Sequence, residues 1–237
     1  MQTAFVIFSK VPWPGKTKSR LHGKLSAEEC ALFHRACLID LHEILKGTGC
    51  KAILYFTGGS REEFALEFPG QMPHGFEELK LLQLGYFTFR QQHGEDLGER
   101  LHHAVTEVLR CYERVILLGS DLPGLAGDLL LSAAENLAQH DVVIGPAVDG
   151  GYYLLGLKKA YKVLFQGISW GSGRVLEQTL KAAENNNLKV SFLPVKRDID
   201  TWEDLVAYVQ SGRKEHNLKN MLSFRLAEYL LEIYDRQ

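Results

Sequence analysis

Residues 10–21, KVPWPGKTKSRL, form a short stretch whose side chains could bind an anion. It contains four cationic residues: Lys10, Lys16, Lys18 and Arg20. Two prolines and Gly15 exclude regular structure, so we expect a rigid loop directly after the apolar run 3–9. Cations concentrated in this way are typical of a phosphate site, although a solvated basic loop has the same composition. A P-loop is excluded, because its first glycine would fall at Lys10.

Two aspartates stand where predicted strands end. Asp121 follows the apolar run 115–118, whose four large side chains are typical of a strand buried on both faces. Asp200, together with Asp198, follows the predicted strand 189–194 and directly precedes a helix. Open α/β sheets bind ligands at the carboxyl ends of their strands, and two carboxylates there can share a Mg²⁺ or Mn²⁺ ion. An ordinary helix N-cap is the alternative interpretation of Asp121.

Two glycine-rich loops add further candidate binding residues. Gly150 and Gly151 follow Asp149 in a turn between predicted strands, where paired glycines allow close approach of the backbone to a ligand. A tight hairpin-like turn explains these glycines equally well. The loop 168–174, ISWGSGR, opens a helix whose free amides suit an anion. With the basic loop and the aspartates, these features predict a site for a nucleoside triphosphate or a nucleotide-diphospho-sugar.

The elements that must position these residues alternate between strand and helix. Apolar runs predict strands at 3–9, 51–57, 115–118, 141–145, 152–157 and 189–194, with 79–84 as a candidate edge strand. Periodicity and capping patterns predict helices at 27–46, stopped by Gly47, and at 101–109, 125–139, 175–184, from 205 and at 218–234.

This alternation predicts the α/β class, with one doubly wound, mostly parallel, Rossmann-like sheet flanked by helices. We expect a single domain over residues 1–237. Residues 213–237 would be a C-terminal helical extension, which closes the sheet or provides the face of a homodimer.

Composition narrows the range of partners. The 237-residue chain is 46% apolar and carries a net charge of −2, so neither nucleic acid nor an anionic membrane is an expected partner. The four cysteines lack metal-ligand spacing and are expected to be buried free thiols. The first residues match no secretion signal, and no apolar run approaches the length of a membrane span. We therefore expect a cytoplasmic protein.

Five blocks of sequence, read in order, resemble a known family. They are FSKVP with PGKTKSRL (8–12, 14–21), DLGER (96–100), GSDLP (119–123), GP with DGGYYLLG (145–146, 149–156) and DIDTWEDL (198–205). The sequence resembles the bacterial DUF2064 proteins of the GT-A-type nucleotide-diphospho-sugar transferase superfamily. These proteins are related to 2-phospholactate guanylyltransferase and the molybdenum-cofactor nucleotidyltransferases. The resemblance covers residues 5 to about 205.

The resemblance implies roles for individual residues. Lys18 and Arg20 would contact the donor phosphates and act in catalysis with Asp121, which would also be the main ligand of Mg²⁺ or Mn²⁺. Asp200 would be the second metal ligand. The rest of the implied binding site consists of Lys10, Gly15 and Lys16 on the phosphate side and Asp149, Gly150, Gly151, Tyr152, Gly171 and Ser172 on the acceptor side.

The implied reaction is a metal-dependent transfer from a nucleotide donor. An anionic acceptor could attack a nucleoside triphosphate with release of pyrophosphate, or an acceptor hydroxyl could attack a nucleotide-sugar, with Asp149 as its base. A catalytically silent nucleotide sensor on the same fold is the alternative from another functional class. Three positions depart from the family pattern, at Ser19, Leu122 and Trp202. The G-G-x-G-x-R loop of typical pyrophosphorylases is absent, so the resemblance does not imply which nucleotide base the donor carries.

Overall fold

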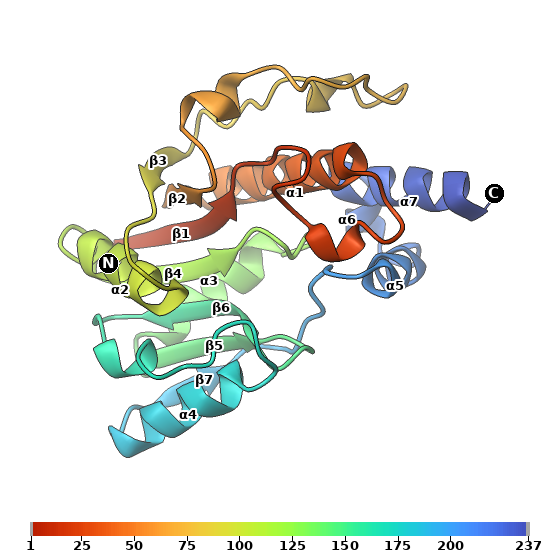
Figure 1. The fold of residues 1–237 in the computed structure, drawn as a ribbon. Helices are drawn as coiled ribbons and strands as arrows, with labels where there is room; N and C mark the ends of the chain where they lie inside the picture. The colour runs from red at the N-terminus through yellow and green to blue at the C-terminus, as the bar shows by residue number, and fades with distance from the viewer. Residues whose placement is uncertain (1, 236–237) are drawn as a thin grey trace.

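Strand β1 (Thr3–Lys10) lies beside the central strand of a seven-stranded sheet in the computed structural model, which describes residues 2–235 (Figure 1). The other strands are β2 (Lys51–Thr57), β3 (Thr88–Gln91), β4 (Arg114–Gly119), β5 (Val142–Pro146), β6 (Tyr152–Leu157) and β7 (Val190–Phe192). Their order is β3-β2-β1-β4-β6-β5-β7, and β6 alone among the described strands is antiparallel to its neighbours. The predicted α/β fold with a mostly parallel sheet is confirmed. The chain leaves β1 toward β2 on one side and β4 lies on the other, which makes the β1–β4 edge a switch point.

Helices cover both faces of the sheet because the side chains of each strand alternate between the faces. Phe5 and Ile7 of β1 pack in one cluster with α1 (Ala27–Thr48) and α3 (Gly127–Asn136). Ala4 and Val6 pack on the other face with α2 (Leu97–Val108) and α4 (Val175–Asn185). Strand β4 is buried on both faces through Leu118, as its apolar run predicts.

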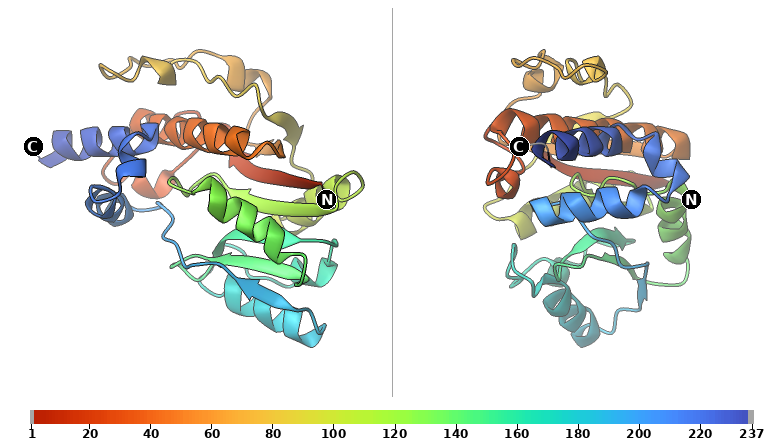
Figure 2. Two further views of the ribbon diagram at one scale, coloured as in Figure 1. Left: turned by 180° about the vertical axis from the view of Figure 1, so that it is seen from behind. Right: turned by 90° about the vertical axis from the view of Figure 1, so that its right-hand side faces the viewer.

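The C-terminal helices pack on the outside of α1. They are α5 (Trp202–Gly212), the single turn α6 (His216–Lys219) and α7 (Leu222–Asp235). The one helix predicted at 218–234 is therefore divided in two, and α7 lies alongside α1 and does not close the sheet (Figure 2). The buried carboxylate of Asp40 on α1 accepts hydrogen bonds from the amides of Leu222 (2.9 Å) and Ser223 (2.8 Å) at the start of α7. This acceptor fixes where α7 begins.

Residues 58–87 form an irregular excursion between β2 and β3, with short 3₁₀ turns η2 (Glu62–Ala65) and η3 (Glu77–Leu79). The strand predicted at 79–84 is absent, and β3 forms the edge of the sheet in its place. Leu79, Leu82 and Leu84 are buried and Leu81 is exposed. The backbone carbonyls of Leu79 and Lys80 accept from the buried guanidinium of Arg35 (2.7 and 3.1 Å). A side chain of α1 thus replaces the partner strand.

Local capping signals are confirmed at two helix starts. Ser26 with Glu29 and Thr201 with Asp204 both form capping boxes, at the starts of α1 and α5. The expected stop at Gly47 is wrong, because α1 continues to Thr48 and ends where Gly49 adopts a left-handed conformation (φ 68°).

The prediction that the four cysteines are buried is only partly confirmed. Cys30 and Cys37 are buried, Cys50 is half-buried and Cys111 is exposed, so the prediction is wrong for Cys111. Across residues 2–235, no helix is both long enough and apolar enough to cross a membrane.

Candidate functional site

Two adjoining cavities lie at the carboxyl ends of β1 and β4. One has a volume of about 460 Å³, and we call it the basic cavity after its cationic lining residues Lys10, Lys18, Arg20 and Arg100. The other has a volume of about 450 Å³, and we call it the acidic cavity after its four aspartates, Asp121, Asp149, Asp198 and Asp200. The residues common to both linings are Phe8, Arg20, Leu97, Asp121 and Asp200. The shared wall therefore carries both predicted metal ligands.

Lys18 is held by Asp121 and by the segment that leads to Asp200. Its backbone is left-handed (φ 51°), and its side chain is only 1% exposed. The ammonium lies 2.8 Å from Oδ1 of Asp121 and donates to the carbonyl oxygens of Asp121 and Ile199. An ammonium group has three N–H donors, and these three acceptors match them. In this conformation Lys18 connects the end of β4 to residue 199 across the shared wall.

This pairing also sets the charges of the two groups. Burial alone would lower the pKa of Lys18, but the carboxylates of Asp121 and, to a smaller extent, Asp200 contribute in the opposite direction and the pKa of Lys18 is raised. Burial alone would raise the pKa of the Asp121 carboxyl, but the nearby cations, Lys18 before Lys10, contribute in the opposite direction and the pKa of Asp121 is lowered. Both groups are therefore charged at neutral pH.

The remaining acidic residues repel one another. Burial, together with the nearby carboxylates of Asp149 and Asp200, raises the pKa of Asp198 to about 6. Burial also raises the pKa of Asp200, although its carboxylate pairs with Arg20 at 2.9 Å. Crowded carboxylates of this kind favour a bound cation.

The donor set fits a hard divalent cation, since carboxylate oxygens are the ligands that Mg²⁺ and Mn²⁺ prefer. Asp121 and Asp200 supply such oxygens on the shared wall. Within residues 2–235, however, no three His, Cys, Asp or Glu side chains already stand in a metal-binding arrangement. Lys18 and Arg20 provide the positive charge beside these carboxylates.

A buried polar cluster around His34 fixes the basic loop against the sheet. His34 Nδ1 lies 2.6 Å from the Thr17 hydroxyl, and Nε2 lies 3.1 and 3.0 Å from the hydroxyls of Ser9 and Ser120. Because Ser9 donates its proton to the carbonyl of Lys10 (2.8 Å), it accepts from His34 Nε2–H, and Nδ1 in turn accepts from Thr17. Burial lowers the pKa of His34 to about 4, so the ring is neutral. The cluster joins the loop to the ends of β1 and β4.

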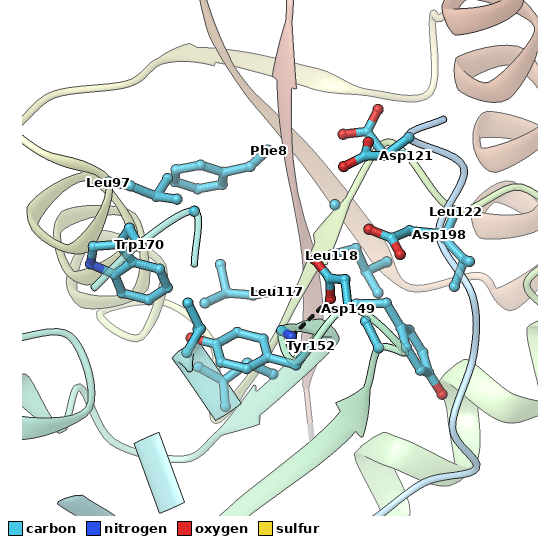
Figure 3. Close-up of a pocket in the computed structure, with 18 of the residues that line it drawn as sticks. Phe8, Leu97, Leu117, Leu118, Asp121, Leu122, Asp149, Tyr152, Trp170 and Asp198 are labelled. Carbon is cyan, nitrogen blue, oxygen red and sulfur yellow. Dashed lines mark hydrogen bonds between the residues drawn. The ribbon is translucent and has the colours of Figure 1, made fainter. Parts of the chain in front are cut away.

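The acidic cavity has two chemically different ends. Figure 3 shows the side chains of Phe8, Leu97, Leu117, Tyr152 and Trp170 at one end. Asp121, Asp149 and Asp198 lie at the other end, with Leu118 and Leu122 beside them. Tyr152 lines the cavity and its hydroxyl is buried, and its ring packs edge-on against Trp170 with the ring centroids 6.4 Å apart. The cavity is thus apolar and aromatic at one end and acidic at the other.

Glycines bring the loops around this cavity together. Gly150 has a positive φ of 88°, and any side chain there would collide with the carbonyl of Gly173. The close approach that its sequence predicts is therefore to protein backbone. A side chain at Gly98, in the first turn of α2, would likewise collide with the Trp170 indole and the Phe165 carbonyl. These contacts place Trp170 over the start of α2.

The structure brings most of the predicted site residues to the two cavities. Those that line one or both are Lys10, Lys18, Arg20, Asp121, Asp149, Gly151, Tyr152, Gly171, Ser172 and Asp200. Gly15, Lys16 and Gly150 line neither, and Lys16 pairs with Glu63 at 3.2 Å.

Sequence reasoning did not select Asp198, Arg100 or His34 for the site. For Asp198 a signal was present, because Ile199 is buried and Asp198 and Asp200 flank it in an extended segment, so both point to the same side. His34 gives no comparable signal, because its partners Ser9, Thr17 and Ser120 meet only in the folded chain.

Comparison with solved structures finds similarities at different levels of sequence identity. A crystal structure from Desulfovibrio desulfuricans, described as a "putative nucleotide-diphospho-sugar transferase", is 29% identical, covers 100% of this chain and 98% of that chain, and has a TM-score of 0.84. The Mycobacterium tuberculosis protein Rv0371c in complex with manganese is 14% identical over 89% of this chain and 100% of that chain, with a TM-score of 0.52. CMP:2-keto-3-deoxy-manno-octonic acid synthetase complexed with CTP is 10% identical over 91% and 100%, with a TM-score of 0.51. The last two show the fold alone.

No curated protein sequence matches the chain. The model of the family described as "Uncharacterized protein conserved in bacteria (DUF2064)" matches residues 41–172, more than half of the sequence. The chain therefore belongs to the DUF2064 family and has the fold of the nucleotide-diphospho-sugar transferases.

Proposed function

We propose that this protein is a metal-dependent transferase whose donor is a nucleoside triphosphate or a nucleotide-diphospho-sugar. The observation that carries the proposal is the shared wall, on which Asp121 and Asp200 face the basic cavity and the acidic cavity at once. A group bound there can touch a donor on one side and an acceptor on the other. The manganese and CTP complexes of proteins with the same fold support this proposal.

The basic cavity would receive the donor phosphates. Lys10, Arg20 and Arg100 line it, and an array of guanidinium and ammonium groups suits a phosphate chain. Lys18 adds positive charge beside Asp121, but its three N–H donors are already taken by Asp121 and Ile199. A divalent ion held by Asp121 and Asp200 would neutralise phosphate charge and stabilise the leaving group. Arg20, which now pairs with Asp200, would offset charge that develops on the leaving phosphate.

A donor panel tests the proposal. Nucleoside triphosphates and nucleotide-sugars are screened with Mg²⁺ or Mn²⁺ by isothermal titration, followed by assays for released pyrophosphate and nucleoside diphosphate. Metal-dependent binding of at least one donor supports the proposal. Release of pyrophosphate indicates nucleotidyl transfer, and release of a nucleoside diphosphate indicates sugar transfer. The proposal fails if no donor binds.

A catalytically silent nucleotide sensor is the second candidate. The observation in its favour is the Lys18–Asp121 pair, which occupies the carboxylate that a metal-dependent enzyme needs. A sensor would bind a nucleotide without metal and release neither product. The same panel therefore separates the two functions.

A further inference from the structure

We infer that the acidic cavity binds an uncharged, hydroxyl-bearing acceptor that has an apolar or aromatic face. This inference rests on the proposed function, because it names the acceptor class for that same site. It narrows the choice of reaction, since an acceptor that carries a phosphate or carboxylate is excluded.

The charges of the acidic cavity exclude an anion. Its lining contains four aspartates and one cationic residue, Arg20, which already pairs with Asp200. Lys18 pairs with Asp121 from the side of the basic cavity. Within the described residues neither Asp149 nor Asp198 forms an ion pair. A divalent ion bound to Asp121 and Asp200 would neutralise part of this negative charge. The donor phosphates would bind to the same ion and would themselves neutralise its positive charge. No cationic side chain in the lining, as far as the structure describes it, remains to pair with an anionic acceptor, and the amides of the loop 168–174 carry no net charge that could offset the four carboxylates.

The opposite end of the same cavity suits an apolar face. Phe8, Tyr152 and Trp170 surround that end with Leu97 and Leu117 (Figure 3). Aromatic rings bind flat apolar faces, including ring systems that carry hydroxyl groups at their edge. An acceptor with its apolar part between these side chains would extend its polar end toward the aspartates.

A neutral hydroxyl needs a base, and Asp149 lies at the acidic end. Its Oδ1 accepts from the amide of Gly151 at 2.8 Å, which orients the carboxylate. In the reaction, the acceptor oxygen forms a bond to carbon 1 of the donor sugar while its proton passes to the Asp149 carboxylate. The bond between carbon 1 and the diphosphate oxygen breaks, and its electron pair leaves with the nucleoside diphosphate. Phosphate acceptors would need no such base.

Three compounds that combine a phenyl ring, a sugar and a phosphate group in different pairs test the inference. Phenyl β-D-glucopyranoside is neutral and aromatic, phenyl phosphate keeps the ring but is anionic, and glucose 6-phosphate keeps the sugar but is anionic. Binding is followed by nuclear magnetic resonance of the indole N–H groups of the three tryptophans, with the Trp170 signal assigned from Trp170→Phe. We expect the phenyl glucoside to shift the Trp170 signal saturably, with an affinity at least roughly tenfold higher than that of either anion.

Matched variants separate a specific pocket from general changes. Trp170→Leu, which keeps an apolar side chain but removes the aromatic ring, should weaken binding of the phenyl glucoside as measured by isothermal titration. Trp202→Phe, on α5 outside the cavity, should leave the response of the Trp170 signal unchanged. The double variant Asp149→Asn with Asp198→Asn should raise the affinity for phenyl phosphate several-fold, because it removes two negative charges from the acidic end of the cavity. An unchanged affinity for phenyl phosphate would overturn the charge argument.

The inference as a whole is overturned if phenyl phosphate moves the Trp170 signal at least as readily as the phenyl glucoside, or if the glucoside does not move it. These outcomes are independent of the donor panel. If a nucleotide binds but the Trp170 signal does not respond to the phenyl glucoside, the inferred acceptor class is wrong and the proposed function stands. If the Trp170 signal responds but no nucleotide binds, the proposed function is wrong and the cavity still binds a neutral aromatic compound.

Discussion

Lys18 Nζ lies 2.8 Å from Oδ1 of Asp121, so the predicted main metal ligand already has a cation beside it. The lysine side chain is almost fully buried, whereas the aspartate side chain is 48% exposed. The exposed side of the carboxylate faces both cavities, and the ammonium approaches it from within the protein. Lys18 therefore supplies a built-in counter-charge for Asp121, and a metal ion would compete with it.

Replacing Lys18 tests this competition. Lys18→Met keeps the length of the side chain and removes its charge, so we expect the nucleotide-free protein to bind Mn²⁺ roughly tenfold more tightly, as measured by titration or electron paramagnetic resonance. Lys16→Met is the matched control, because Lys16 lies in the same loop but pairs with Glu63 and lines neither cavity. Equal or weaker Mn²⁺ binding by Lys18→Met would contradict the competition.

His34 predicts a loss of stability in mild acid. Burial lowers its pKa from 6.5 to about 4, so the unfolded chain takes up a proton in this range and the folded chain does not. The contribution of neutral His34 to stability is complete above pH 6.5 and is lost as the pH falls toward 4. The free energy of unfolding should drop by about 2 kcal/mol from this group between pH 7.5 and pH 5. Urea unfolding of the protein and of His34→Asn at both pH values measures it, and an equal drop in both proteins would rule out His34 as the source.

Asp40 predicts the stability of the C-terminal helix. Asp40→Ala leaves the amides of Leu222 and Ser223 without their acceptor, and we expect it to cost about 1–3 kcal/mol in the free energy of unfolding. Hydrogen exchange of the first α7 amides should become faster as well. Glu184→Ala, at an exposed carboxylate on α4, should change neither quantity. Unchanged exchange at Leu222 and Ser223 would show that Asp40 does not hold α7.

Substitution by alanine should lower the stability of the protein at Gly98 and raise it at Gly47. Gly98→Ala pushes a methyl group into the Trp170 indole and the Phe165 carbonyl, and should destabilise the protein by about 1–3 kcal/mol. Gly47→Ala, in α1 with open space around it, should stabilise by about 0.5–1 kcal/mol. Thermal melting of the two variants measures both effects. A stable Gly98→Ala protein with an unshifted Trp170 signal would contradict the close packing.

The positions of many site residues can be predicted from the points at which the strands end. The run 115–118 predicts a buried strand, and a buried strand in a parallel sheet places Asp121 at the ligand edge, where the structure has it. The basic loop follows β1 for the same reason. The roles implied for these residues in binding and catalysis stay predictions, as do the single domain and the homodimer face.

What the sequence did not reveal depends on contacts between distant residues. Arg35 gives no local sign that it will supply the hydrogen-bond donors for Leu79 and Lys80, so a strand at 79–84 was the natural but wrong prediction. The His34 cluster likewise joins residues from four separate segments. Periodicity measures burial along one element and cannot report which side chain will meet which backbone group.

The hydrogen bonds from Arg35 to Leu79 and Lys80, which attach residues 58–87 to α1, have a practical consequence. These residues pass over α1, and none of them lines the basic or the acidic cavity (Figure 1). Since the anchor sits at Leu79 and Lys80, the turn around residues 69–75 can accept a fluorescent dye or an affinity tag without contact with either cavity. An immobilised protein attached there would present both cavity mouths freely to solution.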